Sequence, residues 1–260
     1  MNIKSKIGFC VFILIGLFLM FTSGCGKKHD LAPPPAQNGD TSLYTDTVNK
    51  TVYKTVKIGT QLWMAENLKA RKYRDGTVIK KIQTDSSLWR QDTTGAYCIY
   101  QDNFTTPGLL YNWYAVNNTA GLAPVGWHVA TDEEWKTLEE LVGMSVSDAN
   151  GINWRGTHEA DKLKAQSKKQ YGLIQGWQSY NDNLIWSTNE SGFTAFPGGC
   201  RLADGRWSDM GMTFIGFWWT ATPALSGNKV WYRYLDYQKS SVFRNTLSKS
   251  YGCSVRCVHD

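Results

Sequence analysis

Residues 126–135 read GWHVATDEEW, and this stretch decides the fold of the chain around it. Thr131 followed three residues later by Glu134 is the capping-box pattern of a helix N-terminus, in which each residue's side chain binds the other's backbone N–H. One apolar stripe with helical spacing then follows, formed by Trp135, Leu138, Leu141 and Val142. Gly143 is suited to the position just past a helix end. We therefore predict a helix between Thr131 and Gly143.

Strand patterns flank this helix on both sides. Before it, residues 51–58 alternate as a strand and residues 61–65 follow a Gly-Thr turn as its hairpin partner, with shorter apolar pieces at 78–82 and 96–100. After it, aromatic and β-branched runs predict an antiparallel meander over residues 217–222, 230–237, 241–245 and 254–259. Two further helices are expected at 108–117 and 159–168. Helices early and strands late predict an α+β domain with much irregular loop.

The amino terminus has the form of a secretory signal. Lys4 and Lys6 precede an uncharged apolar run over residues 7–21, and small residues follow it. The run is shorter than the roughly 20 residues that span a bilayer. Gly24-Cys25 resembles the lipobox of bacterial lipoproteins, in which the Cys is acylated and becomes the new amino terminus; Thr22 departs from the Leu usual there. The alternative is ordinary cleavage that leaves Cys25 as a free thiol.

Residues 26–48 are polar and include three consecutive prolines at 33–35, which favour an extended tether. His29 has no partner at metal-ligand spacing and is expected to be solvated. We therefore divide the chain into a signal peptide at 1–24, a lipid-anchored linker at 25–48 and a folded domain at 49–260.

Composition and charge exclude several classes of protein. The chain has 260 residues, of which 42% are hydrophobic, so it has enough apolar material for a core and is not disordered throughout. Its net charge of +6 falls to +4 without the signal, because that segment holds two Lys and no acid. So mild a balance does not argue for nucleic acid as a partner.

Six phrases occur in order along the chain: VKIGTQLWMAENL at 56–68, LYNWYAV at 110–116, GWHVAT with EW at 126–135, GF with FPGG at 192–199, FWWT at 217–220 and SVRCV at 254–258. Together they resemble the Fibrobacter succinogenes major paralogous domain family, which is commonly found on secreted proteins and lipoproteins of Bacteroidetes and Fibrobacter relatives. The resemblance implies a fold related to C-type lectins and formylglycine-generating enzymes, and an envelope address. It implies no catalytic activity and no cofactor.

Four cysteines remain in the domain, and export permits their oxidation. Cys253 and Cys257 lie about 13 Å apart on a regular strand, too far for a disulfide, so each must pair with Cys98 or Cys200 if it pairs at all. Spacing leaves both combinations open. The family comparison favours Cys98 with Cys257 and Cys200 with Cys253, because Cys200 and Cys253 stand where the family usually has two aromatic residues. The alternative is four reduced, buried thiols.

The sequence offers little for catalysis. An oxidase of the formylglycine-generating type would use Cys253 and Cys257 to hold copper, but their spacing is one residue shorter than in that enzyme pattern. The calcium and sugar phrases of C-type lectins are absent, and residues 207–209 and 181–183 are interpreted as turns. His128 has no His or carboxylate at ligand spacing, so we expect it to be structural.

Aromatic residues are the remaining lead to a ligand. Most must fill the core, but a minority on exposed loops or strands would be platforms for sugar faces or peptides. The candidates are Trp207, Trp218, Trp219, Tyr232 and Tyr234. Alternation places Tyr232 and Tyr234 on one sheet face and Trp231 and Arg233 on the other.

These patterns together predict a non-catalytic binding or adhesion module for glycan or protein, held at the cell envelope through Cys25. The expected location is the outer membrane, facing either the periplasm or the cell surface. The alternatives are the oxidase and a purely structural envelope component. No cofactor and no metal are expected.

Overall fold

The computed structural model describes residues 41–100, 108–170, 173–178, 187–225 and 227–260. These residues lie in one compact unit that extends to Asp260. The signal, Cys25 and most of the tether lie outside the described residues, as do residues 181–183. The elements are β1 Thr41–Asp46, β2 Thr51–Ile58, β3 Gln61–Met64, β4 Lys80–Lys81, α1 Ser86–Gln91, β5 Ala96–Cys98, β6 Leu110–Tyr111, α2 Trp113–Val116, β7 Trp127–Val129, α3 Asp132–Leu141, α4 Val146–Asn150, β8 Asn153–Arg155, α5 Glu159–Leu163, β9 Lys168–Gln170, β10 Leu173–Gln175, β11 Ile215–Pro223, β12 Lys229–Asp236, β13 Val242–Ser248 and β14 Cys257–His259.

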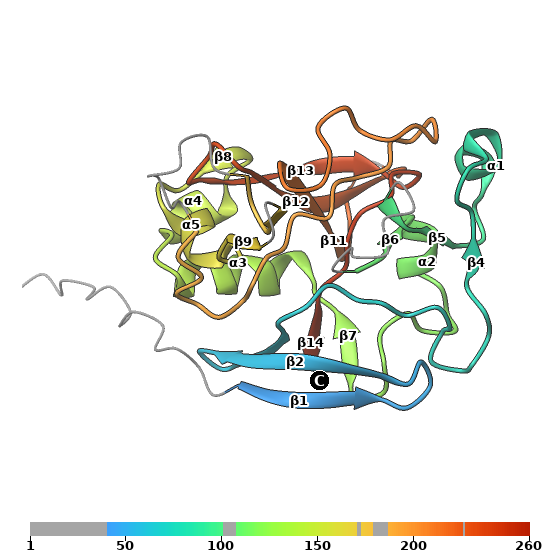
Figure 1. Cartoon of the computed structure of the whole chain (residues 1–260), viewed down its shortest axis with the longest axis horizontal. Coiled ribbons are helices and arrows are strands. Elements are labelled where there is room, and N and C mark those ends of the chain that lie inside the picture. Colours follow the sequence, from blue (N-terminus) through green and yellow to red (C-terminus); the bar gives the residue numbers. More distant parts are fainter. Residues whose placement is uncertain (1–40, 101–107, 171–172, 179–186, 226) are drawn as a thin grey trace, which may run out of the picture. The chain divides into compact units, whose positions relative to one another are not determined.

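A five-stranded antiparallel sheet has the order β1-β2-β3-β14-β7. The β2–β3 hairpin is confirmed. The linker boundary is wrong, because β1 pairs with β2 along its whole length, from Thr41 opposite Val56 to Asp46 opposite Thr51 (Figure 1). β1 is an edge strand with mostly exposed side chains, so its polar sequence resembled that of the tether.

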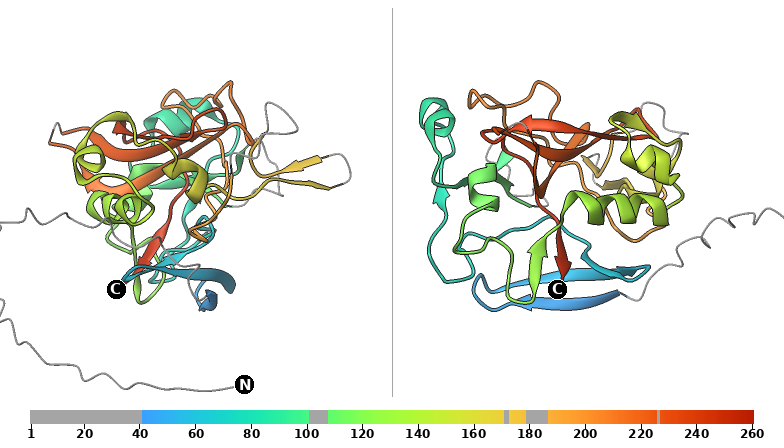
Figure 2. Two further views of the ribbon diagram at one scale, coloured as in Figure 1. Left: turned by 90° about the vertical axis from the view of Figure 1, so that its left-hand side faces the viewer. Right: turned by 180° about the vertical axis from the view of Figure 1, so that it is seen from behind.

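A second antiparallel sheet has the order β11-β12-β13-β8, and its first three strands are the expected meander. α3 lies under one face of this sheet, and the β9–β10 hairpin projects to the side (Figure 2). The segment 254–259 is not a fourth strand of the meander as expected. Only Cys257–His259 is a strand, and it pairs with β3 and β7 in the other sheet. The described part of the chain is therefore an α+β domain.

The central helix α3 agrees with its prediction. The hydroxyl of Thr131 accepts from the backbone N–H of Glu134, and the Glu134 carboxylate accepts from the N–H of Thr131. Gly143 follows the helix with a φ of +115°, in the left-handed region that favours glycine.

The other two expected helices are much shorter than predicted. Residues 110–111 form strand β6, which leaves only Trp113–Val116 helical. α5 ends at Leu163, because the carbonyl of Leu163 and the N–H of Ala165 bind the backbone of Ala195 instead of continuing the helix.

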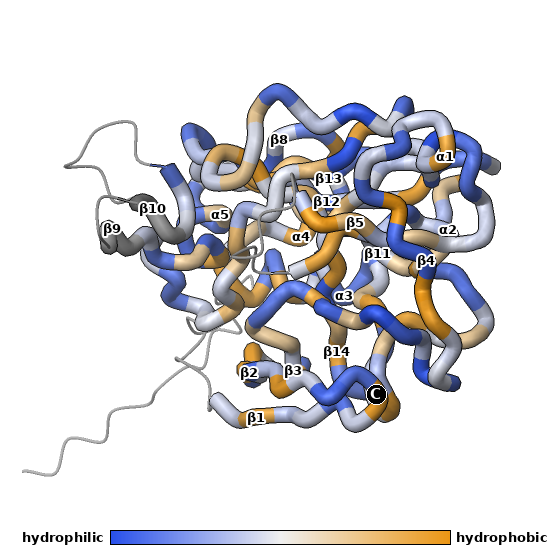
Figure 3. Tube along the Cα trace, turned by 45° about the vertical axis from the view of Figure 1, so that its right-hand side comes forward, coloured by the Kyte–Doolittle hydropathy of each residue, from blue (hydrophilic) through white to orange (hydrophobic). Residues whose placement is uncertain are grey.

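Two large apolar clusters and a smaller one fill the space between the sheets and helices. Apolar stretches pass through interior strands such as β5 and β14, whereas much of the outer chain is hydrophilic (Figure 3). Eight of the eleven tryptophans in the described ranges are buried, namely Trp63, Trp89, Trp113, Trp127, Trp135, Trp177, Trp218 and Trp219. Most of the tryptophans therefore serve as core, as expected. None of the helices in the described ranges has the length and hydropathy needed to cross a bilayer.

Candidate functional site

Four aromatic side chains form a continuous row across the second sheet, one from each strand. Phe217 of β11 lies opposite Tyr234 of β12, Tyr234 opposite Phe243 of β13, and Phe243 opposite Trp154 of β8. Directly opposed residues of antiparallel strands share one face, so the four rings stand side by side. We call these four residues the aromatic row, and the face that bears them the outer face.

The rings of the aromatic row are in contact and partly exposed. The ring centroids are 4.6 Å apart for Phe217 and Tyr234, 5.9 Å for Tyr234 and Phe243, and 5.2 Å for Phe243 and Trp154. Trp154 is 38% exposed and the other three are intermediate. Tyr232 stacks on Phe217 at 5.6 Å with nearly parallel planes, but it is buried and supports the row from its side.

Polar groups border the aromatic row. The Asn245 amide donates to the Asn153 side-chain oxygen at 2.9 Å, and Nζ of Lys239 lies 6.0 Å from the Trp154 ring. The Tyr234 hydroxyl donates to a carboxylate oxygen of Asp236 at 2.6 Å. Burial and the bond to Asp236 both raise the pKa of Tyr234, so its hydroxyl stays protonated and keeps this orientation.

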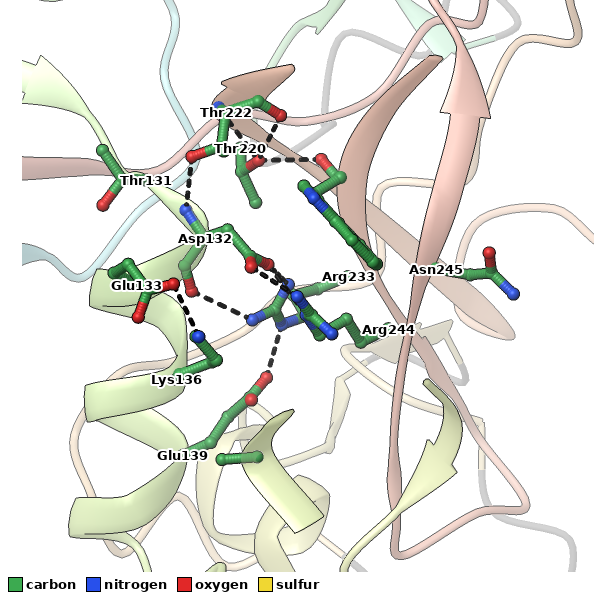
Figure 4. A network of polar contacts seen from close by, with 12 residues as sticks. Thr131, Asp132, Glu133, Lys136, Glu139, Thr220, Thr222, Arg233, Arg244 and Asn245 are labelled. Carbon is green, nitrogen blue, oxygen red and sulfur yellow. Dashed lines mark hydrogen bonds and ion pairs between the residues drawn. The ribbon is translucent and has the colours of Figure 1, made fainter. Parts of the chain in front are cut away.

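The opposite face of the same strands is joined to α3 by buried ion pairs (Figure 4). Arg233 donates to Asp132 at 2.6 Å and to Glu139 at 2.6 Å, and Arg244 donates to Asp132 at 2.6 Å. Arg155 of β8 binds both carboxylate oxygens of Glu139 at 2.9 and 3.0 Å. Figure 4 shows Asn245 pointing away from this network, toward the outer face.

Three guanidinium groups thus share two carboxylates, and all five side chains are buried. Burial alone would raise the pKa of Asp132, but the hydrogen bonds and charges of Arg244 and Arg233 outweigh it and hold that pKa below its usual value. Since breaking one partner of a buried pair leaves an uncompensated charge, the network fixes the sheet on α3. It therefore holds the strands that carry the aromatic row.

Residues from several of the signature phrases meet at Asn67. Its amide oxygen accepts from the Trp218 indole at 2.9 Å and from Nε of Arg256 at 2.8 Å, and its amide nitrogen donates to the Ser254 hydroxyl at 3.3 Å. Arg256 is fully buried and also donates to the backbone oxygens of Met64 and Phe193. Burial lowers its pKa to about 9. The cluster around Asn67 is buried from solvent. It therefore stabilises the fold and is not a ligand site.

The five residues predicted to bind a ligand do not lie together on one exposed face in the structure. Trp218 and Trp219 are 0% exposed, so the expectation that they face a ligand is wrong. Trp218 points to the α3 side, and the Trp219 indole donates to the Tyr111 backbone at 2.8 Å. Trp207 is partly exposed but lies outside the row, against Tyr100 and Arg201.

Of the predicted pair on β12, Tyr234 lies in the row and Tyr232 beside it. Their placement on one face, opposite to Arg233, is confirmed. Sequence reasoning missed Phe217, Phe243 and Trp154. Pairing the alternating positions of the meander would have found the two phenylalanines, whereas the three-residue strand β8 gave no pattern of its own.

His128, which is expected to be structural, has two carboxylate partners that its spacing in the sequence did not indicate. Its Nε2 lies 2.7 Å from Glu134 and its Nδ1 lies 2.7 Å from Asp260. Burial would lower the pKa of His128, but the hydrogen bonds to Asp260 and Glu134 raise it overall. His128 therefore joins the helix cap to the end of β14.

All four domain cysteines are buried free thiols in this structure. Neither of the two expected bonds, Cys98 with Cys257 or Cys200 with Cys253, is formed in this structure. Cys98 pairs with Leu110 in the β4-β5-β6 sheet, whereas Cys257 pairs with Val129 in the β1-β2-β3-β14-β7 sheet. Among the described residues, no group of three or more His, Cys, Asp or Glu side chains is arranged to hold a metal ion.

The fold and this face define an α+β domain with a rigid antiparallel sheet that presents aromatic rings. The chain belongs to the Fibrobacter succinogenes major domain family, whose sequence profile matches residues 56–259. Comparison with curated proteins gave no match, and comparison with solved structures gave none either.

Proposed function

We propose that the chain is a cell-envelope lipoprotein whose domain binds a glycan along the aromatic row. The observation that carries this proposal is the unbroken register of Phe217, Tyr234, Phe243 and Trp154 on a partly exposed sheet face. Sequence features support the anchor: a signal-like segment ends at Cys25, and a proline-bearing tether follows it.

The chemistry of the row favours a glycan over other ligands. Flat rings pack against the C–H faces of sugars, and polar groups beside them bind hydroxyls. Here the Asn153–Asn245 amide pair and Lys239 supply donors and acceptors at the border. Four strands at a spacing of about 4.8 Å give a row about 14 Å long, which suits an oligosaccharide rather than a single sugar.

Rigidity supports the same proposal. A binding face loses less conformational entropy on complex formation when its strands are already fixed. The buried ion pairs of Arg155, Arg233 and Arg244 with α3 hold β8, β12 and β13 from the opposite face. These are three of the four strands that carry the aromatic row. The aromatic row is thus preorganised before a ligand arrives.

The oxidase alternative gains no support from the geometry. Cys253 and Cys257 are both 0% exposed, and their backbone partners belong to different strands, Tyr111 for Cys253 and Val129 for Cys257. If the aromatic row binds no ligand, the conclusion becomes the other alternative, that the protein is a purely structural envelope component.

A glycan array tests the proposal with three forms of the protein: wild type, W154A and L43A. Leu43 is a matched control because it is an exposed apolar side chain on β1, in the other sheet. We expect wild type and L43A to bind the same glycan and W154A to bind it about tenfold more weakly. Absence of any glycan ligand, or equal binding by W154A, would refute the proposal.

The anchor is tested separately by labelling cells with a radioactive fatty acid. The label is expected on wild type and not on C25S. An unlabelled wild-type protein would remove the anchor but would leave the glycan proposal untouched.

A further inference from the structure

Cys200 and Cys253 lie directly opposite each other on two antiparallel segments. Arg201 and Gly252 exchange both backbone hydrogen bonds, with N···O distances of 2.9 and 2.8 Å. In an antiparallel ladder, the residues that flank such a pair are the next opposed pair, which here is Cys200 with Cys253.

The backbone groups of both cysteines turn away from each other. The N–H and C=O of Cys253 both bind Tyr111 on the far side, at 3.0 and 2.9 Å, and the carbonyl of Cys200 accepts from Ser208. Cys200 and Cys253 are therefore a non-hydrogen-bonded pair, in which Cα atoms are about 4.5 Å apart and both side chains point to the same face. A disulfide requires Cα atoms about 4.4–6.8 Å apart.

The third thiol of this region is placed less favourably. Cys98 pairs with Leu110 on β6, and Tyr111 of β6 pairs with Cys253. Two strand spacings, about 10 Å, therefore separate Cys98 from Cys253, which exceeds disulfide reach. Cys98 instead lies beside the Arg201 guanidinium.

We propose that Cys200 and Cys253 form a cross-strand disulfide in the exported protein. The oxidant is a small or protein disulfide, R–S–S–R. One cysteine thiolate attacks a sulfur of R–S–S–R and releases one thiol, and the second cysteine thiolate then attacks the mixed disulfide and releases the other. Two electrons and the two cysteine protons end on the two released R–SH molecules.

The bond forms before the segments close. Both thiols are buried in the folded domain, and burial raises the pKa of Cys200 to about 11, so the thiolate needed for exchange is scarce once folding is complete. The disulfide is therefore a structural cross-link between segments 199–201 and 252–254, and its burial makes it resistant to later reduction.

Trypsin makes the proposal directly testable, because it separates the four domain cysteines. Cleavage after Lys and Arg leaves Cys98 in 91–136, Cys200 in 170–201, Cys253 in 250–256 and Cys257 in 257–260. The protein is folded with oxidised and reduced glutathione, unfolded in urea with iodoacetamide so that every free thiol is blocked, and digested without reduction. We expect peptide 170–201 linked to peptide 250–256, with Cys98 and Cys257 alkylated. Alkylation of both Cys200 and Cys253, or a link from Cys253 to Cys98, would overturn the proposal.

Thermal unfolding of protein that was folded with or without reductant gives a second readout on matched variants. Reductant is expected to lower the Tm of wild type and of C98A by about 10 °C, and to leave that of C200A unchanged. In reductant, C200A and wild type should unfold at similar temperatures, which shows that C200A folds. An equal response of C200A and C98A to reductant would contradict the disulfide.

Discussion

Arg233 of β12 donates to Asp132 at the first position of α3 over 2.6 Å, with both side chains buried. Asp132 also binds Arg244 of β13, so one carboxylate joins the helix to two strands of the sheet that bears the aromatic row. The helix cap places this carboxylate: Thr131 starts the helix, and Asp132 follows at the end where the helix dipole favours a negative charge. The capping phrase of the sequence therefore also sets the geometry of the candidate site.

The substitution D132N tests this connection. It leaves Arg233 and Arg244 buried with one carboxylate fewer, so the free energy of unfolding should fall by about 3–5 kcal/mol. Urea unfolding at neutral pH measures it. D204N is the matched control, because Asp204 pairs with Arg206 at the surface and should not change stability measurably. A D132N protein within about 1 kcal/mol of wild type would show that the network does not hold the sheet.

The substitution N67A tests whether the shared signature residues are structural. It removes the acceptor for the Trp218 indole and for Nε of Arg256, both of which lie in the core. Unsatisfied buried donors cost about 1–3 kcal/mol each, so a loss of about 3 kcal/mol or more is expected. Asn228, which is exposed, gives the control N228A. If N67A loses ligand binding but no stability, Asn67 belongs to a functional site instead.

His128 predicts a pH dependence of stability. Its folded pKa is raised, so its stabilising contribution is fully present below the unfolded pKa of about 6.5 and is lost as pH rises through the folded pKa. Comparison of wild type with H128Q by urea unfolding at about pH 5.5 and pH 9 should show a larger difference at the lower pH. D260N, which removes one of the two partners, should reduce that pH dependence. Equal differences at both pH values would contradict the assignment.

The cap of α3 makes a smaller contribution. T131A removes the hydroxyl that accepts from the backbone of Glu134, and a cost of about 1 kcal/mol is expected. T137A is the control on the same helix, since Thr137 is exposed and alanine favours a helix. Thermal or urea unfolding that ranks T137A below T131A would show that the cap is not the source of the effect.

The sequence predicted those parts of the fold that local patterns determine. The helix after Thr131 carries its own cap, stripe and terminal glycine, and the β2–β3 hairpin and the meander carry strong alternation. Elements that depend on distant partners were missed. β1 is polar and becomes a strand only because β2 supplies its hydrogen bonds, and β14 enters the first sheet between strands far away in sequence.

The candidate site shows the same limit. Alternation placed Tyr232 and Tyr234 on one face, but it could not tell which rings other segments would cover, so Trp218 and Trp219 were wrongly offered as ligand residues. Trp154 enters the row through long-range pairing of β8 with β13. The partners of His128 were missed for a similar reason, because Asp260 approaches it only through the pairing of β14 with β7.

The position of a bound glycan on the protein tests the central claim most directly. Nuclear magnetic resonance of ¹⁵N-labelled protein, titrated with the glycan that the array selects, reports which backbone and indole N–H groups change. The indole signal of Trp154 is assigned by its loss in W154F. We predict that the perturbed signals belong to β8, β11, β12 and β13 and include the Trp154 indole. Perturbations confined to the β1-β2-β3-β14-β7 sheet, with the Trp154 indole unchanged, would contradict the account.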